Sequence, residues 1–314
     1  MGVDSRAPFI ISDSTADSPT DSTPDSAADA TATSDPTFAT FDTGRRIAYT
    51  EYGDPAGDPV VFLHGTPGSR LLASAFDSAA ATAGVRLLAF DRPGFGGSDP
   101  WPARSISDAG RVVTAVLDDA ALDTAALVAF SGGSQPAVAT AATHGDRVSA
   151  VDIVSGATPP SVSEATPTLQ RVLGTLATRA APLLRGLFRG QAWLAARRDP
   201  SLVVSQYRAD DPDTPLDDEM AAVVKADFVE AFANSRLGVV TEFRNGATDW
   251  NIDFSTVEEP ITLWHGDRDT NVPLPDARRF VSVLPTATLT VNTAADHLGT
   301  LVESVPNILE RVGE

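Results

Sequence analysis

A serine on a short turn between an apolar run and a helical run constrains this chain more than any other feature. The run 125–130 is apolar, the run 135–143 has helical character, and the residues Ala129 to Gly133 (AFSGG) join them. Such a sharp turn needs small residues on either side of the serine, because larger side chains would collide. The turn presents the Ser131 hydroxyl to a base and a substrate, so Ser131 is a candidate nucleophile.

Strand-like and helix-like runs alternate around this turn. Strands are expected at 38–43, 46–52, 59–63, 85–90, 125–130, 148–154, 260–264 and 287–292. Helices are expected near 70–83, 107–121 and 135–143. This alternation is typical of the α/β class, in which a mostly parallel, doubly wound sheet carries helices on both faces. Ligands of such sheets bind outside the carboxyl ends of the strands, where Ser131 also falls.

A serine hydroxyl is a weak nucleophile alone, so an acid and a base should follow it along the chain. His297 comes after the strand at 287–292, and Asp269 lies in the loop after the strand at 260–264. Asp267 is the alternative acid. Ser134 is an alternative nucleophile, but it falls inside the following helix.

The other histidines are more readily explained by structural roles. His64 and His265 each end a strand and precede a glycine, so we expect them to orient loops through hydrogen bonds. His144 is expected to end a helix. Asp91 and Arg92 are expected to form a structural pair or to clamp a turn.

Four segments, in this order, resemble the α/β-hydrolase fold superfamily over roughly residues 38–312. They are HGTPG at 64–68, DRPGFGGSD at 91–99, the serine turn, and GDRDTNVP at 266–273. Two positions depart from the usual pattern, because Ala129 and Asp296 stand where glycines are common. Neither change removes a catalytic group.

The resemblance implies a Ser-His-Asp triad made of Ser131, His297 and Asp269. It also implies an oxyanion hole formed by the backbone N–H groups of Thr66 and Gly132. Neither a metal nor an organic cofactor is required by this chemistry.

Strand-like and helix-like runs no longer alternate between residues 157 and 250. Helices are expected there at 166–179, 183–197 and 216–232. The resemblance implies that 157–250 is a helical lid inserted into a core formed by 37–156 and 251–314. The lid would cover the site and select substrates. Its large side chains supply the expected substrate contacts, which are Trp193, Tyr207, Phe232 and Trp250.

The serine at the turn narrows the choice of reaction. Epoxide hydrolases and haloalkane dehalogenases of this superfamily use aspartate there, so Ser131 argues against both. The leading prediction is hydrolysis of a small or medium carboxylic ester through an acyl-enzyme. A proline iminopeptidase-like aminopeptidase stays open, with Asp217, Asp218 and Glu219 as candidates to hold the substrate amine. Perhydrolysis, carbon–carbon bond hydrolysis and a slow-turnover ligand-binding protein also stay open.

The composition is strongly acidic. There are 42 acidic and 23 basic residues, and Lys225 is the single lysine, which gives a formal charge of −19. This charge disfavours nucleic acid and anionic membranes as partners. We expect a small-molecule substrate. The protein is also expected to be a monomer or a homodimer.

The chain has no cysteine, which excludes disulfides and thiolate chemistry. The N-terminal residues show no basic region followed by an apolar stretch, and no apolar run approaches about 18 residues, so we expect neither a secretory signal nor a membrane span, and we expect a cytoplasmic location. Residues 1–36 are rich in Asp, Ser, Thr, Ala and Pro, and we expect a disordered acidic tail there.

The acidic, lysine-poor composition resembles that of salt-adapted proteins, in which screening suppresses repulsion between surface carboxylates. We predict that folding and activity need roughly molar salt. Melting temperature and activity would be measured across a salt series. An unchanged melting temperature and full activity in dilute buffer would count decisively against this prediction.

Overall fold

The computed structural model describes residues 35–42, 44–163, 168–209 and 216–314. The compact unit Asp35–Glu314 contains all the described helices and strands. The tail expected at 1–36 lies outside the described residues, apart from its last two.

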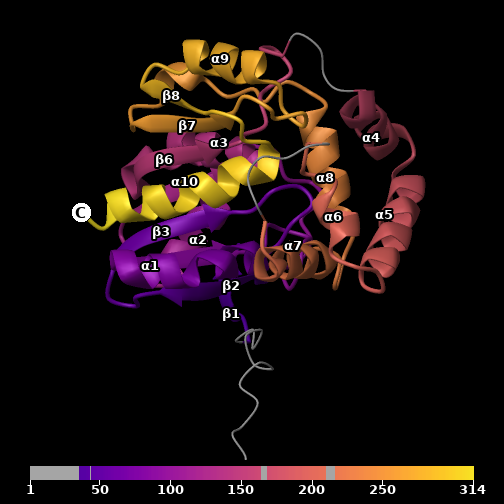
Figure 1. The fold of residues 1–314 in the computed structure, drawn as a ribbon, viewed down its shortest axis with the longest axis horizontal. Coiled ribbons are helices and arrows are strands. Elements are labelled where there is room, and N and C mark those ends of the chain that lie inside the picture. The colour runs from indigo at the N-terminus through magenta and orange to yellow at the C-terminus, as the bar shows by residue number, and fades with distance from the viewer. Residues whose placement is uncertain (1–34, 43, 164–167, 210–215) are drawn as a thin grey trace, which may run out of the picture. The chain divides into compact units, whose positions relative to one another are not determined.

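In the described part of the chain, eight strands form one sheet in the order β1-β2-β4-β3-β5-β6-β7-β8 (Figure 1). The strands β1 and β2 are antiparallel to their neighbours, and every pairing from β4 to β8 is parallel. This confirms the mostly parallel sheet predicted from the sequence. The strands are β1 (Thr37–Phe41), β2 (Arg45–Gly53), β3 (Asp58–Leu63), β4 (Val85–Phe90), β5 (Ala125–Phe130), β6 (Val148–Val154), β7 (Ile261–Gly266) and β8 (Ala287–Asn292).

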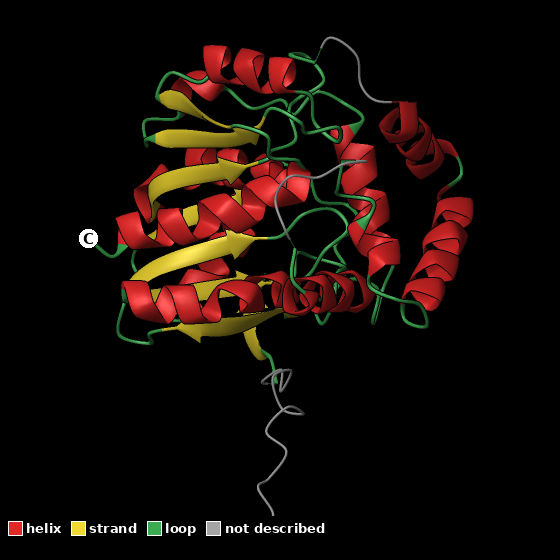
Figure 2. Cartoon of the chain, viewed as in Figure 1, coloured by secondary structure: helices red, strands yellow, loops and turns green. Residues whose placement is uncertain are grey.

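Helices cover both faces of this sheet, as Figure 2 shows. They are α1 (Asp77–Ala83), α2 (Ala109–Asp119), α3 (Ser134–His144), α9 (Leu274–Val283) and α10 (His297–Val312). Helices α1 and α10 contact each other on one face, and α2 and α3 contact each other on the opposite face. Each face buries its own apolar cluster, and Phe280 of α9 belongs to the α2–α3 cluster. The central strands are therefore buried on both sides, which explains their continuous apolar runs.

Between β6 and β7, the described residues form five further helices at the carboxyl ends of the parallel strands (Figure 1). They are α4 (Thr168–Arg179), α5 (Ala181–Ala195), α6 (Ser201–Val204), α7 (Asp218–Glu230) and α8 (Leu237–Gly246). We call these helices and the described loops between them the helical insertion. Short 3-10 helices complete the described elements: η1 (Arg70–Phe76), η2 (Ser131–Gly133), η3 (Gly145–Arg147) and η4 (Phe254–Thr256).

The helices α4, α5 and α7 fall where the sequence predicts helices, with ends that differ by a few residues. Residues 166 and 167 of the first predicted helix lie outside the described residues. The helices α6 and α8 were not predicted. The α8 sequence, LGVVTEFRNG, contains two glycines and three β-branched residues, which lower intrinsic helix propensity. Its contacts with α4 and α5 supply the stabilisation that its sequence lacks.

No helix in the described ranges is long and apolar enough to span a bilayer.

Asp227 of α7 ties the helical insertion to the loop after β3. Its carboxylate accepts hydrogen bonds from the backbone N–H of Ser69 at 2.6 Å and from the Ser69 hydroxyl at 3.0 Å. Burial raises the pKa of Asp227 to about 8, although the bonds from Ser69 act in the opposite direction. The folded protein therefore keeps this carboxyl protonated at a pH where an unfolded chain ionises it.

This difference predicts a pH-dependent stability. The Asp227 contribution is full below the unfolded pKa of about 3.9, and it declines as the pH rises towards about 8, because only the unfolded state releases the proton. Asp227→Asn, which never ionises, should flatten this decline. Urea unfolding at a series of pH values and one salt concentration measures it.

Asp218→Asn is the matched control, because Asp218 is exposed on the same helix. It should keep the pH dependence of the parent protein. Equal pH slopes for the parent and Asp227→Asn would contradict the assignment.

Candidate active site

Ser131 lies on a strained turn between β5 and α3. Its φ is 52°, in the left-handed region that residues other than glycine rarely adopt. The Ser131 carbonyl accepts the N–H of Ala157 at 2.9 Å, so the chain after β6 helps to hold the turn. A strained turn of this kind exposes a nucleophile above the end of a strand.

The glycines after Ser131 are required because the loop after β3 approaches closely. A Cβ atom on Gly132 would lie 2.4 Å from the Oγ1 of Thr66, and one on Gly133 would lie 2.3 Å from the carbonyl oxygen of Leu63. Any side chain at these positions would push the serine turn away from that loop. The sequence predicted that larger side chains would collide at this turn, and the structure shows that they would collide with Thr66 and Leu63.

His297 and Asp269 are directly hydrogen-bonded. The Nδ1 of His297 lies 2.7 Å from the Oδ2 of Asp269, and both side chains are buried. The Oδ1 of Asp269 accepts the N–H groups of Asn271 at 2.8 Å and Val272 at 2.9 Å. Burial raises the pKa of Asp269, but His297, His265 and the hydrogen bond from the Val272 N–H outweigh burial, so the pKa lies below its usual value. An ionised Asp269 holds the proton on Nδ1 and leaves Nε2 of His297 as the acceptor.

The helical insertion also holds the loop that carries His297. The ring of Tyr207 stacks on the ring of His297, with centroids 6.3 Å apart, and the Tyr207 carbonyl accepts the N–H of Leu298 at 3.1 Å. The Nε of Arg208 donates to the Oδ2 of Asp296 at 2.7 Å. Asp296, which replaces a common glycine, therefore links the histidine loop to the insertion and also caps α10.

A guanidinium lies behind the two backbone segments that are expected to bind an oxyanion. Arg92 donates from Nη2 to the carbonyl of Gly65 at 2.7 Å and from Nη1 to the carbonyl of Gly132 at 3.1 Å. The Gly65 carbonyl and the Thr66 N–H belong to one planar trans peptide unit and point in opposite directions. By holding this carbonyl, Arg92 fixes the direction of the Thr66 N–H.

Glu242 of α8 supplies the counter-charge of Arg92. Its Oε2 accepts from the Nη1 of Arg92 at 2.9 Å, and its Oε1 accepts from the Nη2 of Arg104 at 2.5 Å. All three side chains are buried. Burial raises the pKa of Glu242, but the two arginines outweigh burial and hold the pKa below its usual value. The helical insertion thus contributes a buried anion to the support of the candidate oxyanion loop.

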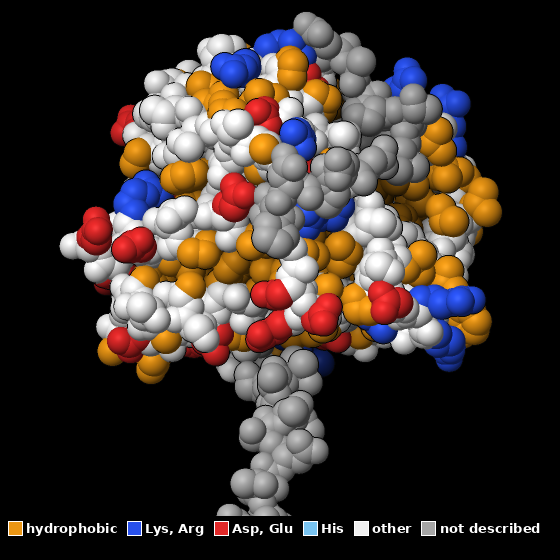
Figure 3. Space-filling view, in the orientation of Figure 1, with side chains coloured by type: hydrophobic (Ala, Val, Ile, Leu, Met, Phe, Trp, Pro, Cys, Tyr) orange, Lys and Arg blue, Asp and Glu red, His pale blue; other side chains and the backbone are white. Residues whose placement is uncertain are grey.

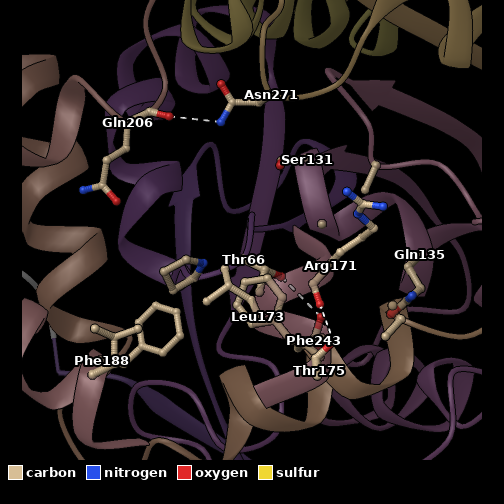
Figure 4. Close-up of a pocket in the computed structure, with 18 of the residues that line it drawn as sticks. Thr66, Ser131, Gln135, Arg171, Leu173, Thr175, Phe188, Gln206, Phe243 and Asn271 are labelled. Carbon is tan, nitrogen blue, oxygen red and sulfur yellow. Dashed lines mark hydrogen bonds between the residues drawn. The ribbon is translucent and has the colours of Figure 1, made fainter. Parts of the chain in front are cut away.

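Ser131 and His297 open into one cavity of about 1230 Å³, together with Thr66 and Gly132. Figure 4 shows side chains of the insertion around this cavity, such as Phe188. In the same view, the side-chain amide of Asn271 donates to the carbonyl of Gln206 at 3.0 Å. No cluster of three or more potential metal ligands is found among the described residues.

The alternative residues from the sequence have other partners. Asp267 is exposed and accepts the N–H of Ala294 at 2.7 Å, and Ser134 donates its hydroxyl to the carbonyl of Ala157 at 2.6 Å. Neither Asp267 nor Ser134 lines the cavity.

The acids considered for an aminopeptidase lie at the start of α7. Asp217 caps the helix by accepting the N–H of Met220 at 2.7 Å, and Asp218 and Glu219 follow in its first turn. None of the three lines the cavity.

The remaining histidines have the structural contacts that the sequence indicated. His64 is buried, and its Nδ1 lies 2.7 Å from the carbonyl oxygen of Gly65. The Nε2 of His265 lies 2.9 Å from the carbonyl oxygen of Val272, and His144 is the last residue of α3.

Asp91 and Arg92 do not pair with each other, although the sequence suggested such a pair. Asp91 instead pairs with Arg70 at 2.7 Å and accepts the N–H of Gly97 at 2.8 Å. The alternative role as a turn clamp therefore fits Asp91.

The structure places two of the four expected substrate contacts at the cavity and two elsewhere. Tyr207 and Trp250 line the cavity. Trp193 is 59% exposed on α5 and stacks with Arg197, whereas Phe232 is buried and stacks on Phe188. Neither of these two lines the cavity, because Trp193 faces outward on α5 and Phe232, which follows the end of α7, packs into the apolar core.

Sequence reasoning missed Glu242 and Arg104. One signal was present, because Glu242 interrupts the otherwise apolar run LGVVTEF, in which a lone carboxylate indicates a buried and paired charge. The sequence offered no comparable signal for Arg104.

Comparison with known proteins identifies the chain's relatives. A model of the family described as alpha/beta hydrolase fold matches residues 58–303. The curated 2-hydroxy-6-oxononadienedioate/2-hydroxy-6-oxononatrienedioate hydrolase of Paraburkholderia phymatum is 30% identical over 78% of this chain and 82% of its own length. The protein of the same name from Cupriavidus pinatubonensis is 28% identical over 82% of this chain and 86% of its own length.

Solved structures confirm the fold. A bromoperoxidase from Bacillus anthracis superposes with a TM-score of 0.70 at 19% identity and covers 88% of this chain and 99% of its own. An esterase from Exiguobacterium antarcticum superposes with a TM-score of 0.67 at 18% identity, over 88% of this chain and 97% of its own.

The contacts of Glu242 predict a kinetic role for this buried carboxylate. Glu242→Gln removes the counter-charge of Arg92, and the support of the Thr66 N–H should loosen. If Thr66 and Gly132 are the oxyanion donors, kcat should fall roughly 10- to 100-fold, because small displacements of catalytic groups cost about this much. The KM should change little, since such donors act mainly in the transition state.

Glu230→Gln is the matched control. Glu230 is also a carboxylate of the insertion, and it pairs with the buried Arg70 at 2.7 Å, but it does not line the cavity. Both variants should lower the free energy of unfolding, whereas only Glu242→Gln should lower kcat. An equal change of kcat in the two variants would show that Glu242 merely stabilises the fold.

Proposed function

The chain belongs to the alpha/beta hydrolase fold family, and from this premise we propose that it is a serine hydrolase of carboxylic esters. One observation carries the proposal. The hydrogen-bonded pair of His297 and Asp269, with a 2.7 Å contact, opens into the same cavity as the strained Ser131. A strained serine, a histidine and a buried carboxylate supply the three roles of a catalytic triad.

Acylation begins when the Oγ of Ser131 attacks the ester carbonyl carbon and Nε2 of His297 accepts the hydroxyl proton. The carbonyl π electrons move to oxygen, and the resulting oxyanion accepts hydrogen bonds from the N–H groups of Thr66 and Gly132. The intermediate then collapses. The alkoxide leaves with the proton from His297, and the acyl group stays on Ser131 as an ester.

Deacylation repeats these steps with water. His297 removes a proton from water, which attacks the acyl carbon, and the Ser131 oxygen leaves and regains a proton. The ionised Asp269 stabilises the imidazolium that forms in each half of the reaction. Ser131 and His297 therefore return to their starting protonation states after every turnover, and no reagent besides water is needed.

A second candidate is hydrolysis of an oxo-dioate, which the names of the curated relatives support. In this chain such a substrate would place a ketone carbonyl rather than an ester at Ser131. The reaction would then break a carbon–carbon bond. A substrate panel containing 4-nitrophenyl esters and a 2-hydroxy-6-oxo dienedioate separates the two candidates by which of them turns over.

The triad assignment predicts labelling of a single serine. In roughly molar salt, where screening favours an acidic folded chain, a fluorophosphonate should modify Ser131 and no other residue. Ser131→Ala should lose the label, and its kcat should fall by at least roughly 10⁴-fold. Intact mass and peptide mapping identify the adduct.

Asp269→Asn should lower kcat by about 10⁴-fold because it favours the wrong tautomer of the histidine. Asp267→Asn is the matched control and should retain activity. A well-folded protein without an adduct, or an adduct on another serine, would overturn the triad, and the ligand-binding alternative would become the better explanation.

A further inference from the structure

The first part of the helical insertion is basic, although the protein as a whole is acidic. Residues 168–209 contain seven arginines and a single acidic residue, Asp199, so this segment has a formal charge of +6 within a chain of −19. Helices α4 and α5 contain four of the arginines and no acidic residue. In Figure 3, blue side chains gather at the right-hand edge, where Figure 1 places α4 and α5.

Two of these arginines line the cavity that holds Ser131. Arg171 and Arg179 lie on the cavity face of α4, and Thr175 and Thr178 lie between them on the same face. Their positions follow helical spacing, so this wall of the cavity carries positive charge at both ends of α4. Arg185 and Arg189 of α5 do not line the cavity.

An anion that enters this cavity meets no uncompensated carboxylate among the described lining residues. The arginines and carboxylates among them are Arg171, Arg179 and Glu242. Glu242 already accepts from Arg92 and Arg104 through its two oxygens. The two other charged lining residues, Arg171 and Arg179, are both cationic.

Local ion pairing within the fold does not explain this charge. Arg179, Arg185 and Arg189 form no ion pair with any described residue, in contrast to the core arginines Arg70 and Arg92. A protein of charge −19 repels an anionic substrate, and a basic segment beside the cavity offsets that repulsion locally. A neutral substrate would gain nothing from this arrangement.

The cavity also has room for an apolar part of a substrate. Leu187 and Leu194 of α5 line the same cavity, and Gly186 and Gly190 have no heavy atom within 4 Å of where a Cβ would stand. With a volume of about 1230 Å³, the cavity holds more than a scissile ester alone.

We propose that this cavity recognises a substrate that bears a carboxylate in addition to its scissile bond, and that Arg171 and Arg179 bind that carboxylate. The inference rests on the proposed serine hydrolase function for the chemistry at Ser131. Arginine suits this role because its planar fork matches the two oxygens of a carboxylate.

The test compares two esters of similar length, mono-4-nitrophenyl adipate and 4-nitrophenyl heptanoate, which differ in whether the acyl chain ends in a carboxylate. The double variant Arg171→Gln/Arg179→Gln is compared with Arg185→Gln/Arg189→Gln, which removes the same charge from the neighbouring helix. All measurements use the lowest salt concentration at which every variant remains folded, because salt screens the attraction.

We expect the parent protein to prefer the adipate ester. Arg171→Gln/Arg179→Gln should lose on the order of tenfold in kcat/KM for this ester, mainly through KM, as expected for lost charge-assisted hydrogen bonds. Its activity on the heptanoate ester should stay within about twofold, because that ester has no charge to bind. The control pair should retain the preference.

No preference for the adipate ester in the parent protein would overturn the proposal. Equal losses in the two double variants would also overturn it, because they would indicate diffuse attraction instead of a binding site. Calorimetric titration with adipate gives a readout independent of turnover. Weaker binding by Arg171→Gln/Arg179→Gln alone supports the site even if neither ester is hydrolysed, and equal binding by all proteins contradicts it.

Discussion

The buried ion pair of Arg92 and Glu242 beneath the candidate oxyanion loops is the interaction on which the rest of the candidate site depends. Arg92 contacts the carbonyls of Gly65 and Gly132, so one guanidinium holds both backbone segments of the candidate oxyanion hole. Transfer of a charge into a protein interior costs several kcal/mol unless it is paired. Glu242 of the helical insertion forms the ion pair with Arg92, so this buried pair joins the core loops to the insertion.

The insertion is joined to the core by further buried polar contacts. Arg70 bridges Asp91 of the core and Glu230 of the insertion, and Asp227 accepts from Ser69. Buried polar groups tolerate little displacement, because each unmet hydrogen bond is costly in a medium of low dielectric. These contacts therefore fix the position of the insertion more narrowly than apolar packing alone, and with it the shape of the cavity.

The sequence predicted the sheet and the candidate triad because both leave local signals. A strand that is buried on both faces reads as an unbroken apolar run, and the predicted boundaries of 125–130 and 148–154 match β5 and β6. The contribution of α8 could not be predicted, because its weak helix propensity is compensated by contacts with distant elements. The sequence also did not show which side of a helix each large side chain would occupy. The sequence indicates that Trp193 is large, but only the packing of α5 shows that Leu184, Phe188 and Ala192 are buried and Trp193 is not.

The order of these parts along the chain has a consequence for synthesis. Ser131 and its turn precede the insertion, whereas His297 begins the last helix and is held by Tyr207 and Arg208 of the insertion through its loop. A chain still emerging from the ribosome therefore contains the proposed nucleophile before the proposed base has been made. Under the proposed triad, a product truncated before α10 would carry Ser131 but could not activate it.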